Sequence, residues 1–190
     1  MTAMPVAEPM TAEEYLARPY DERERGWELI GGEIVDMHDP LLAHELVCRE
    51  INYALELWTR AQSGRGLVIR SIDVGIGPHD VYGPDVHWYR EDRVPSRHSG
   101  RPYPVPDLAV EVRSPSTWRY DIGAKKSGYE RARLPELWLV DTPAEEILIF
   151  RRSRADAPTF DVALELTRDD TLTSPLLAGF ALPVGAIFAA

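Results

Sequence analysis

Two carboxylates and a lysine are the residues of this sequence whose types and positions could support chemistry. Glu111 lies within the apolar run Leu108–Val112, where a charge is costly unless it is paired or bound to a cation. Asp85 directly precedes another apolar run, and Lys125 and Tyr129 are four residues apart, which places them on one face of a helix. Carboxylates hold Mg²⁺, and a lysine can orient a water or stabilise charge that develops on a phosphate. Together these groups would suit metal-assisted hydrolysis of a phosphate ester.

Each of these residues also has an ordinary structural explanation. An Asp that follows Pro commonly forms a turn, which would account for Asp85. Glu111 could pair with Arg113 on the same strand face, or contact solvent at the edge of a sheet. A lysine on a helix is usually just solvated, as the adjacent Lys126 illustrates. Spacing alone does not bring the side chains together, so both explanations stay open.

Several familiar sites are missing from the sequence. It has no phosphate-binding loop, no dinucleotide-binding glycine motif, no serine-hydrolase elbow and no H-E-x-x-H zinc motif. Cys48 is the only cysteine, which excludes an internal disulfide framework and any cysteine-based zinc site. A histidine-rich transition-metal site is not expected, because the histidines are scattered without paired ligand spacing. They are His38, His44, His79, His87 and His98.

Hydrophobic periodicity predicts the elements that must position the candidate residues. Apolar residues close to a 3.6-residue spacing predict a helix over 42–60, and Gly31-Gly32 between two strand-like runs predicts a hairpin over 27–37. Further strands are predicted over 68–76, 86–89, 108–113, 137–140 and 147–150, and further helices over 11–18 and 121–133. This order indicates a mixed α/β fold: a central mixed sheet flanked by helices, with an N-terminal helix and hairpin. We expect one domain over residues 1–190.

Amino-acid composition and net charge restrict the kinds of partner that the protein can have. The chain has 31 acidic and 21 basic residues, a net charge of -10, which argues against non-specific affinity for a polyanion. Residues 86–154 differ, because they hold 13 basic and 10 acidic residues and include an arginine-rich loop over 90–106. That asymmetry indicates either an unevenly charged surface or a basic groove in an acidic body. No apolar run reaches the ~20 residues of a membrane-spanning helix, and we expect a soluble, cytoplasmic protein.

A set of short motifs resembles the Uma-type endonucleases, which are bacterial restriction-endonuclease-like proteins of the PD-(D/E)XK superfamily. The resemblance covers nearly the whole chain and is specific in combination. It is carried by Trp27–Glu33, His44, Pro84-Asp85-Val86, Pro106–Thr117, Asp121-x-Gly123-x-Lys125-x-x-x-Tyr129, Leu134–Asp141, Thr171–Leu177, Gly179-Phe180 and Leu182-Pro183.

The resemblance implies a restriction-endonuclease-like core that binds Mg²⁺, with Mn²⁺ as a substitute, and cleaves DNA. Asp85 and Glu111 would be metal ligands, and Lys125 would be a catalytic lysine moved from the strand to the neighbouring helix. Glu28 matches a family position that could supply a third metal ligand or a substrate contact. Arg113 stands where the superfamily pattern has its strand lysine; it is too basic to accept a proton but can bind a phosphate. Besides Arg113, the implied substrate contacts are Tyr129 and His44.

Two other functions compete with DNA cleavage. The chain could be a catalytically degenerate nuclease-fold module that binds nucleic acid or protein, a reading that Arg113 supports. It could also be a carboxylate-dependent enzyme acting on another substrate, since paired acids serve glycoside hydrolysis as well. The resemblance further implies a homodimer, for which Trp58 or the tail Phe180–Ala190 offers apolar surface, although either could equally be core.

Overall fold

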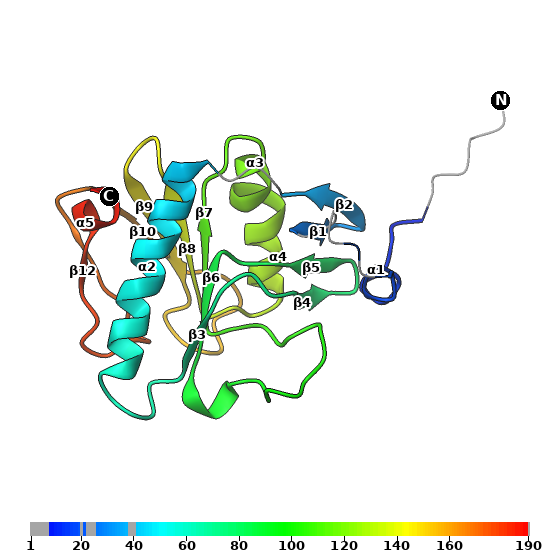
Figure 1. Cartoon of the computed structure of the whole chain (residues 1–190), viewed down its shortest axis with the longest axis horizontal. Coiled ribbons are helices and arrows are strands. Elements are labelled where there is room, and N and C mark those ends of the chain that lie inside the picture. Colours follow the sequence, from blue (N-terminus) through cyan, green and yellow to red (C-terminus); the bar gives the residue numbers. More distant parts are fainter. Residues whose placement is uncertain (1–7, 20, 22–25, 38–40, 190) are drawn as a thin grey trace.

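A computed structural model describes residues 8–19, 21, 26–37 and 41–189 of the chain (Figure 1). Its helices are α1 (Ala12–Leu16), α2 (Leu42–Arg60), α3 (Trp118–Tyr120), α4 (Lys126–Arg131) and α5 (Val184–Ile187), with a 3₁₀ turn η2 (Glu91–Arg93) and a π-helical turn η3 (Asp121–Lys125). Its strands are β1 (Trp27–Ile30), β2 (Glu33–Asp36), β3 (Leu67–Ile69), β4 (Val74–Gly77), β5 (Asp80–Tyr82), β6 (Val86–Tyr89), β7 (Leu108–Val112), β8 (Glu136–Asp141), β9 (Glu146–Arg151), β10 (Val162–Leu166), β11 (Thr171–Leu172) and β12 (Leu182–Pro183).

The central sheet has six strands in the order β10-β9-β8-β7-β6-β3. β7 and β8 are parallel, and the other neighbouring pairs are antiparallel, so the sheet is mixed. A parallel pair needs a crossover connection, which α3, η3 and α4 supply between β7 and β8. The predicted mixed α/β fold with a central sheet flanked by helices is confirmed.

Alternation along β7 divides the protein into two apolar layers. Leu108, Val110 and Val112 face a core shared with α2 and α5, whereas Ala109 faces a second core that contains Tyr129 of α4. Glu111 lies on this second face. Because both faces of the strand are covered, the carboxylate of Glu111 is removed from bulk water, with 3% of the residue exposed.

A smaller four-stranded sheet, in the order β2-β1-β5-β4, lies beside the central sheet (Figure 1). β1 and β2 form the predicted hairpin, and both of its turn residues, Gly31 and Gly32, adopt positive φ angles of 60° and 82°. Glycine adopts these angles without the steric cost that other residues meet. After β5 the chain passes through Gly83–Asp85 into β6, so Asp85 lies where the chain changes sheets.

The predicted helices at the N-terminus and over 42–60 are confirmed. Thr11 and Glu14 form a reciprocal capping box at the start of α1. α2 covers the central sheet with a buried stripe at helical spacing. This stripe consists of His44, Val47, Cys48, Ile51 and Leu55.

Two predicted elements differ from the structure. The single strand predicted over 68–76 is wrong: it is divided into β3 and β4, and Ser71 between them has a left-handed φ of 49°. The helix predicted over 121–133 begins earlier, at Trp118, and contains the π-helical turn η3. No helix in the described part of the chain is long and apolar enough to span a bilayer.

Candidate active site

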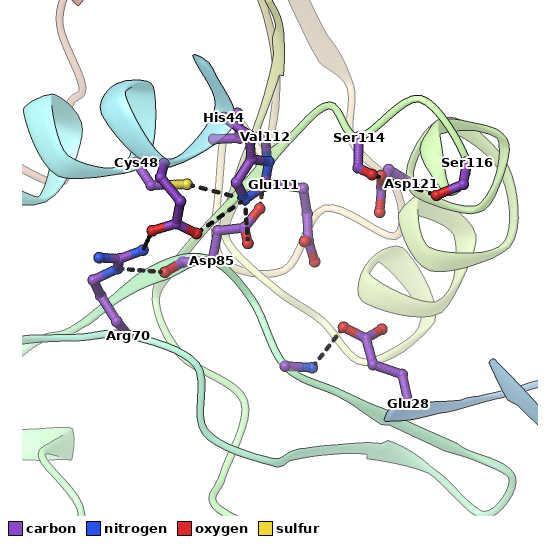
Figure 2. Close-up of polar contacts among 12 residues, drawn as sticks. Glu28, His44, Cys48, Arg70, Asp85, Glu111, Val112, Ser114, Ser116 and Asp121 are labelled. Carbon is purple, nitrogen blue, oxygen red and sulfur yellow. Dashed lines mark hydrogen bonds and ion pairs between the residues drawn. The ribbon is translucent and has the colours of Figure 1, made fainter. Parts of the chain in front are cut away.

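Asp85 is held at the junction between the two sheets by groups from two other segments. Its Oδ2 accepts a hydrogen bond of 2.7 Å from the backbone N–H of Val112, at the end of β7. Its Oδ1 lies 3.3 Å from Nε2 of His44 on α2 (Figure 2). The side chain remains 24% exposed, so one face of the carboxylate is accessible.

Glu111 lies within reach of two donors from the helical crossover. The hydroxyl of Tyr129 donates to its Oε1 over 2.5 Å, and Nζ of Lys125 lies 2.8 Å from the same oxygen. The four-residue spacing of Lys125 and Tyr129 therefore brings both side chains to one carboxylate. Arg113 is not the partner of Glu111, so that ordinary explanation of the buried carboxylate is excluded.

Lys125 is surrounded by carboxylates from three elements. In addition to Glu111, its Nζ lies 3.0 Å from Oε2 of Glu28 on β1 and 3.4 Å from Oδ1 of Asp121, one turn earlier. Glu28 is held in turn by the backbone N–H of Gly83, which donates to its Oε1 over 3.0 Å. Lys125 is completely buried, so a solvated helix-surface lysine is excluded as well.

The burial and close approach of these charged side chains shift their pKa values. Burial raises the pKa of Glu111 well above its usual range, opposed by the charge of Lys125 and reinforced by Asp121 and Glu28. The same effects raise the pKa of Asp121 to about 7. Burial alone would lower the pKa of Lys125, but the charges of the surrounding carboxylates raise it. The lysine is therefore an ammonium group at neutral pH.

Two opposing effects act on the pKa of His44. Burial lowers its pKa, but the hydrogen bond and the charge of Asp85, together with the charge of Glu45, raise it overall. The imidazole of His44 and the carboxylate of Asp85 therefore form a close polar pair at the edge of the site.

These groups line one cavity of about 420 Å³. Its acidic side chains come from six segments of the chain, and its basic groups are His44 and Lys125. The carboxylates of the cavity wall are Glu28, Glu45, Asp73, Asp85, Glu111 and Asp121.

Arg113 and Tyr129, two predicted substrate contacts, do not line this cavity. Arg113 donates from Nη1 to both carboxylate oxygens of Asp141, at 2.9 and 2.8 Å, and lies over the ring of Trp118. Tyr129 is fully buried, and its hydroxyl is occupied by Glu111. Its role as a substrate contact stays a prediction, and the structure shows its hydroxyl bound to Glu111. The third predicted contact, His44, does line the cavity.

The sequence did not assign three carboxylates of the cavity, Glu45, Asp73 and Asp121, to the site, and of these Asp121 contacts Lys125. It precedes Lys125 by four residues, a spacing that predicts an ion pair on a helix, so a signal was present. Its burial, with 2% exposed, could not be inferred from the sequence, because Ile122 beside it is exposed instead.

The arginines of the loop over 90–106 are largely neutralised within the protein. Arg90 pairs with Asp92, Arg93 with Asp107 at 2.6 Å, and Arg101 with Asp73 at 2.9 Å. The loop also lies along β4: the backbone N–H of Gly75 donates to the carbonyl of Tyr103, and the N–H of Tyr103 donates to the carbonyl of Asp73. The basic character of this region in the sequence therefore does not correspond to unpaired positive charge at these three arginines.

Comparison with known proteins places this arrangement in a family. A search of curated proteins gave no match. Among solved structures, the chain is similar to one from Anabaena variabilis ATCC 29413 described as "a putative nuclease belonging to DUF820", with a TM-score of 0.78 and 17% identity over 95% of this chain and 98% of that one. That likeness confirms the restriction-endonuclease-like fold. A family model described as "Uma2: Putative restriction endonuclease" matches residues 12–185. The chain belongs to the Uma2 family.

Proposed function

We propose that the chain is a metal-dependent endonuclease that hydrolyses phosphodiester bonds of DNA. Asp85 and Glu111 hold Mg²⁺, and Lys125 supports the attacking water or the charge of the transition state. The observation that carries the proposal is the convergence of these three residues, from separate segments, on one cavity. Membership of a family described as restriction endonucleases supports DNA as the substrate.

The donor set of the cavity suits a divalent cation. Four acidic side chains, Glu28, Asp85, Glu111 and Asp121, line the cavity together with one ammonium group, so oxygen ligands are in excess over the cation. Oε2 of Glu28 and Oδ1 of Asp121 are buried and, among the described residues, accept no hydrogen bond besides their ion pairs with Lys125. Hard oxygen ligands of this kind are those that Mg²⁺ prefers. Burial and the neighbouring carboxylates raise the pKa of Glu111, and a bound ion would oppose both effects by favouring its carboxylate form.

Lys125 supplies positive charge at the site and does not act as a base. Its three carboxylate partners keep it protonated, so it cannot accept the proton of an attacking water. As an ammonium 2.8 Å from Glu111, it can orient a water by donating to it and can stabilise negative charge on a phosphate oxygen. Mg²⁺, when bound, would add Lewis acidity to the same region.

Tyr129 and Glu28 act as positioning residues. The hydroxyl of Tyr129 fixes one oxygen of Glu111, so the carboxylate presents a defined orientation to the cavity. Glu28, anchored by the N–H of Gly83, holds Lys125 from the opposite side and is placed to serve as a further metal ligand. His44 stabilises the charge of Asp85.

Nicking of supercoiled plasmid in the presence of Mg²⁺ tests the proposal. Asp85→Asn and Glu111→Gln each remove one carboxylate charge with little change of shape, and each should reduce nicking at least 100-fold, about 2.7 kcal/mol of transition-state stabilisation. Glu136→Gln is the matched control. Glu136 is equally buried on the neighbouring strand β8, but it binds Trp138 and Ser174 outside the cavity, so its variant should nick as the wild type does.

The outcomes separate the competing functions. Full activity in either Asp85→Asn or Glu111→Gln would overturn the assignment of the site. A wild type that binds DNA but nicks nothing with Mg²⁺ or Mn²⁺ would favour the catalytically degenerate binding module.

A further inference from the structure

We propose that His44, Cys48 and Asp85 form a binding site for Zn²⁺ or a similar thiophilic divalent metal, with Asp85 shared between this site and the Mg²⁺ site. The sequence argued against a cysteine-based zinc site because the chain has one cysteine and no paired histidines. His44 and Cys48 nevertheless have the i, i+4 spacing that places two ligands of different type on one face of a helix.

Three potential ligand atoms converge at this point (Figure 2). Nε2 of His44 lies 3.4 Å from Sγ of Cys48 and 3.3 Å from Oδ1 of Asp85. All three atoms lie within 4.8 Å of one another. α2 supplies the first two ligands, and the junction between β5 and β6 supplies the third, so the backbone fixes the arrangement from two directions.

Two of the three ligand spacings match those of a tetrahedral zinc site. Zinc binds nitrogen and carboxylate oxygen at about 2.0–2.2 Å and sulfur at about 2.3 Å. With tetrahedral angles, these bond lengths place nitrogen about 3.6 Å from sulfur and about 3.4 Å from oxygen. The distances of 3.4 and 3.3 Å around Nε2 differ from those values by only ~0.1–0.2 Å, and the third pair, Sγ of Cys48 and the Asp85 oxygen, lies within 4.8 Å.

The cavity gives the metal a route and a fourth ligand. His44 and Asp85 line the cavity, whereas Cys48 is completely buried behind them. An ion arriving from the cavity therefore meets the imidazole and the carboxylate first and reaches the thiol last. Oε1 of Glu45 is 4.0 Å from Nε2 of His44, so this carboxylate or a water can complete the coordination.

The ligand types select against Mg²⁺ at this position. Magnesium takes oxygen ligands and demands octahedral geometry, whereas a thiolate and an imidazole favour zinc and related metals. On binding, the S–H bond of Cys48 breaks, the Zn–S bond forms and the proton passes to solvent. His44 binds through the Nε2 lone pair as the tautomer that carries its proton on Nδ1.

A functional consequence follows for the nuclease reaction, and this consequence rests on the proposed function. If Asp85 holds Mg²⁺, zinc at His44, Cys48 and Asp85 withdraws a ligand from the Mg²⁺ site. Zinc would then inhibit nicking in competition with Mg²⁺. The zinc site itself depends only on the three ligands and not on catalysis.

Titration with Co²⁺, a spectroscopic substitute for Zn²⁺, tests the site without any activity measurement. A thiolate ligand produces a sulfur-to-cobalt charge-transfer band in the near ultraviolet. Because Cys48 is the only cysteine, such a band in the wild type can arise only from this residue. We expect the band at one equivalent of Co²⁺ and its loss when Zn²⁺ is added. Absence of the band in the folded wild type would overturn the proposal.

Calorimetric titration of Zn²⁺ into Cys48→Ala gives the second readout, with circular dichroism to verify the fold. Even outer-shell partners change metal affinity 10- to 100-fold, so loss of a ligand should weaken Zn²⁺ binding by more than ~100-fold. Unchanged Zn²⁺ affinity would contradict the site. Mg²⁺-dependent nicking by this variant should persist and become resistant to Zn²⁺. A cobalt band in a protein that does not nick DNA would retain the zinc site and reject the nuclease function, so the two proposals fail separately.

Discussion

Lys125 is the residue on which the candidate site depends most directly for its structure. Its ammonium group is completely buried and lies within 3.4 Å of carboxylate oxygens from Glu28, Glu111 and Asp121. Removal of the lysine would leave three acidic side chains facing one another without a cation. The same charge balance links the stability of the fold to the chemistry of the cavity.

We therefore predict that Lys125→Met lowers the free energy of unfolding by about 3–5 kcal/mol in the absence of metal. Lys126→Met is the matched control, because Lys126 is only partly buried and its ammonium lies over the ring of Phe150. That substitution should cost about 1 kcal/mol or less. Urea denaturation of both variants measures the difference, and equal costs would contradict the structural role of Lys125.

His87 provides a pH-dependent test of burial in the central sheet. Burial lowers the pKa of His87 from 6.5 to about 4. Between about pH 4 and pH 6.5, His87 therefore binds a proton in the unfolded chain but not in the folded chain. The free energy of unfolding should fall as the pH is lowered from 6.5 to about 4. The loss attributable to His87 should be about 3 kcal/mol.

His87→Leu should remove this contribution while filling most of the same space. Urea denaturation at several pH values between 7 and 4 would show a shallower loss of stability in the variant than in the wild type. Identical profiles for the two proteins would mean that His87 is not held in its neutral form.

Individual site residues were predictable to different degrees. Glu111 could be singled out because a charge in an apolar strand needs a partner, and the spacing of Lys125 and Tyr129 correctly predicted a shared helix face. Glu28 was assigned only through the family resemblance. The sequence did not indicate that Arg113 would pair with Asp141, because the contact joins residues 28 positions apart, one just after β7 and the other at the end of β8.

At the scale of elements, the crossover helix between β7 and β8 positions the site through an irregular turn. In η3 the backbone N–H of Lys126 reaches the carbonyl of Asp121, five residues earlier, which widens the helix locally. The turn begins with Asp121 and ends with Lys125, two charged residues of the cavity. One turn later, Gly128 brings α4 into close contact with Tyr82.

Two glycine substitutions in this crossover test its packing. A Cβ at Gly128 would lie 2.2 Å from the hydroxyl of Tyr82, which is buried and donates to Asp80, so the ring has little freedom to move away. Gly128→Ala should destabilise the protein by about 1–3 kcal/mol. Gly123→Ala meets no atom within 4 Å and should be neutral or stabilising by up to about 1 kcal/mol.

Thermal unfolding of the two variants, monitored by circular dichroism, distinguishes these expectations. Equal melting temperatures would show that α4 can move away from Tyr82 without cost.

Elements with a strong local signal were predictable, and elements set by long-range contacts were not. The apolar stripe of α2 and the Gly31-Gly32 turn specify their structures locally. The break between β3 and β4 has no such signal, because residues 68–76 have the composition of one strand, yet β3 pairs with β6 and β4 pairs with β5 in a different sheet. The sequence does not predict the π-helical turn either, since its residues have the composition of an ordinary helix.

At the scale of the whole molecule, the net charge of -10 must be reconciled with a DNA substrate. The ion pairs of Arg90, Arg93 and Arg101 mean that the arginine-rich loop offers less free positive charge than its sequence indicates. Binding to DNA should therefore involve few phosphate contacts. Local contacts at the cavity would contribute more than a general attraction between protein and polyanion.

The salt dependence of DNA binding measures the number of phosphate contacts. Fluorescence anisotropy of a labelled duplex measures the binding constant, and EDTA in the buffer prevents metal-dependent cleavage. We expect the logarithm of the binding constant to fall with the logarithm of the KCl concentration, with a slope of about -2 to -4. A slope near zero would exclude electrostatic contact with the phosphates. A slope near -10 would mean that the loop ion pairs open to bind DNA.

The apolar surface that was considered for self-association is largely core. Trp58 packs edge-on against Trp88 and donates to the carbonyl of Ala178. In the tail, Phe180, Val184 and Ile187 are buried against the central sheet, while Ala190 lies outside the described residues. The homodimer stays a prediction, and these residues offer no ready interface for it.

The most direct test of the account is calorimetric titration of Mg²⁺ and Mn²⁺ into the wild type, Glu111→Gln and Glu136→Gln. The account predicts binding of one or more divalent ions to the wild type and to Glu136→Gln, and its loss in Glu111→Gln. Absence of binding to the wild type, or undiminished binding to Glu111→Gln, would contradict the claim that the buried carboxylates form a metal site.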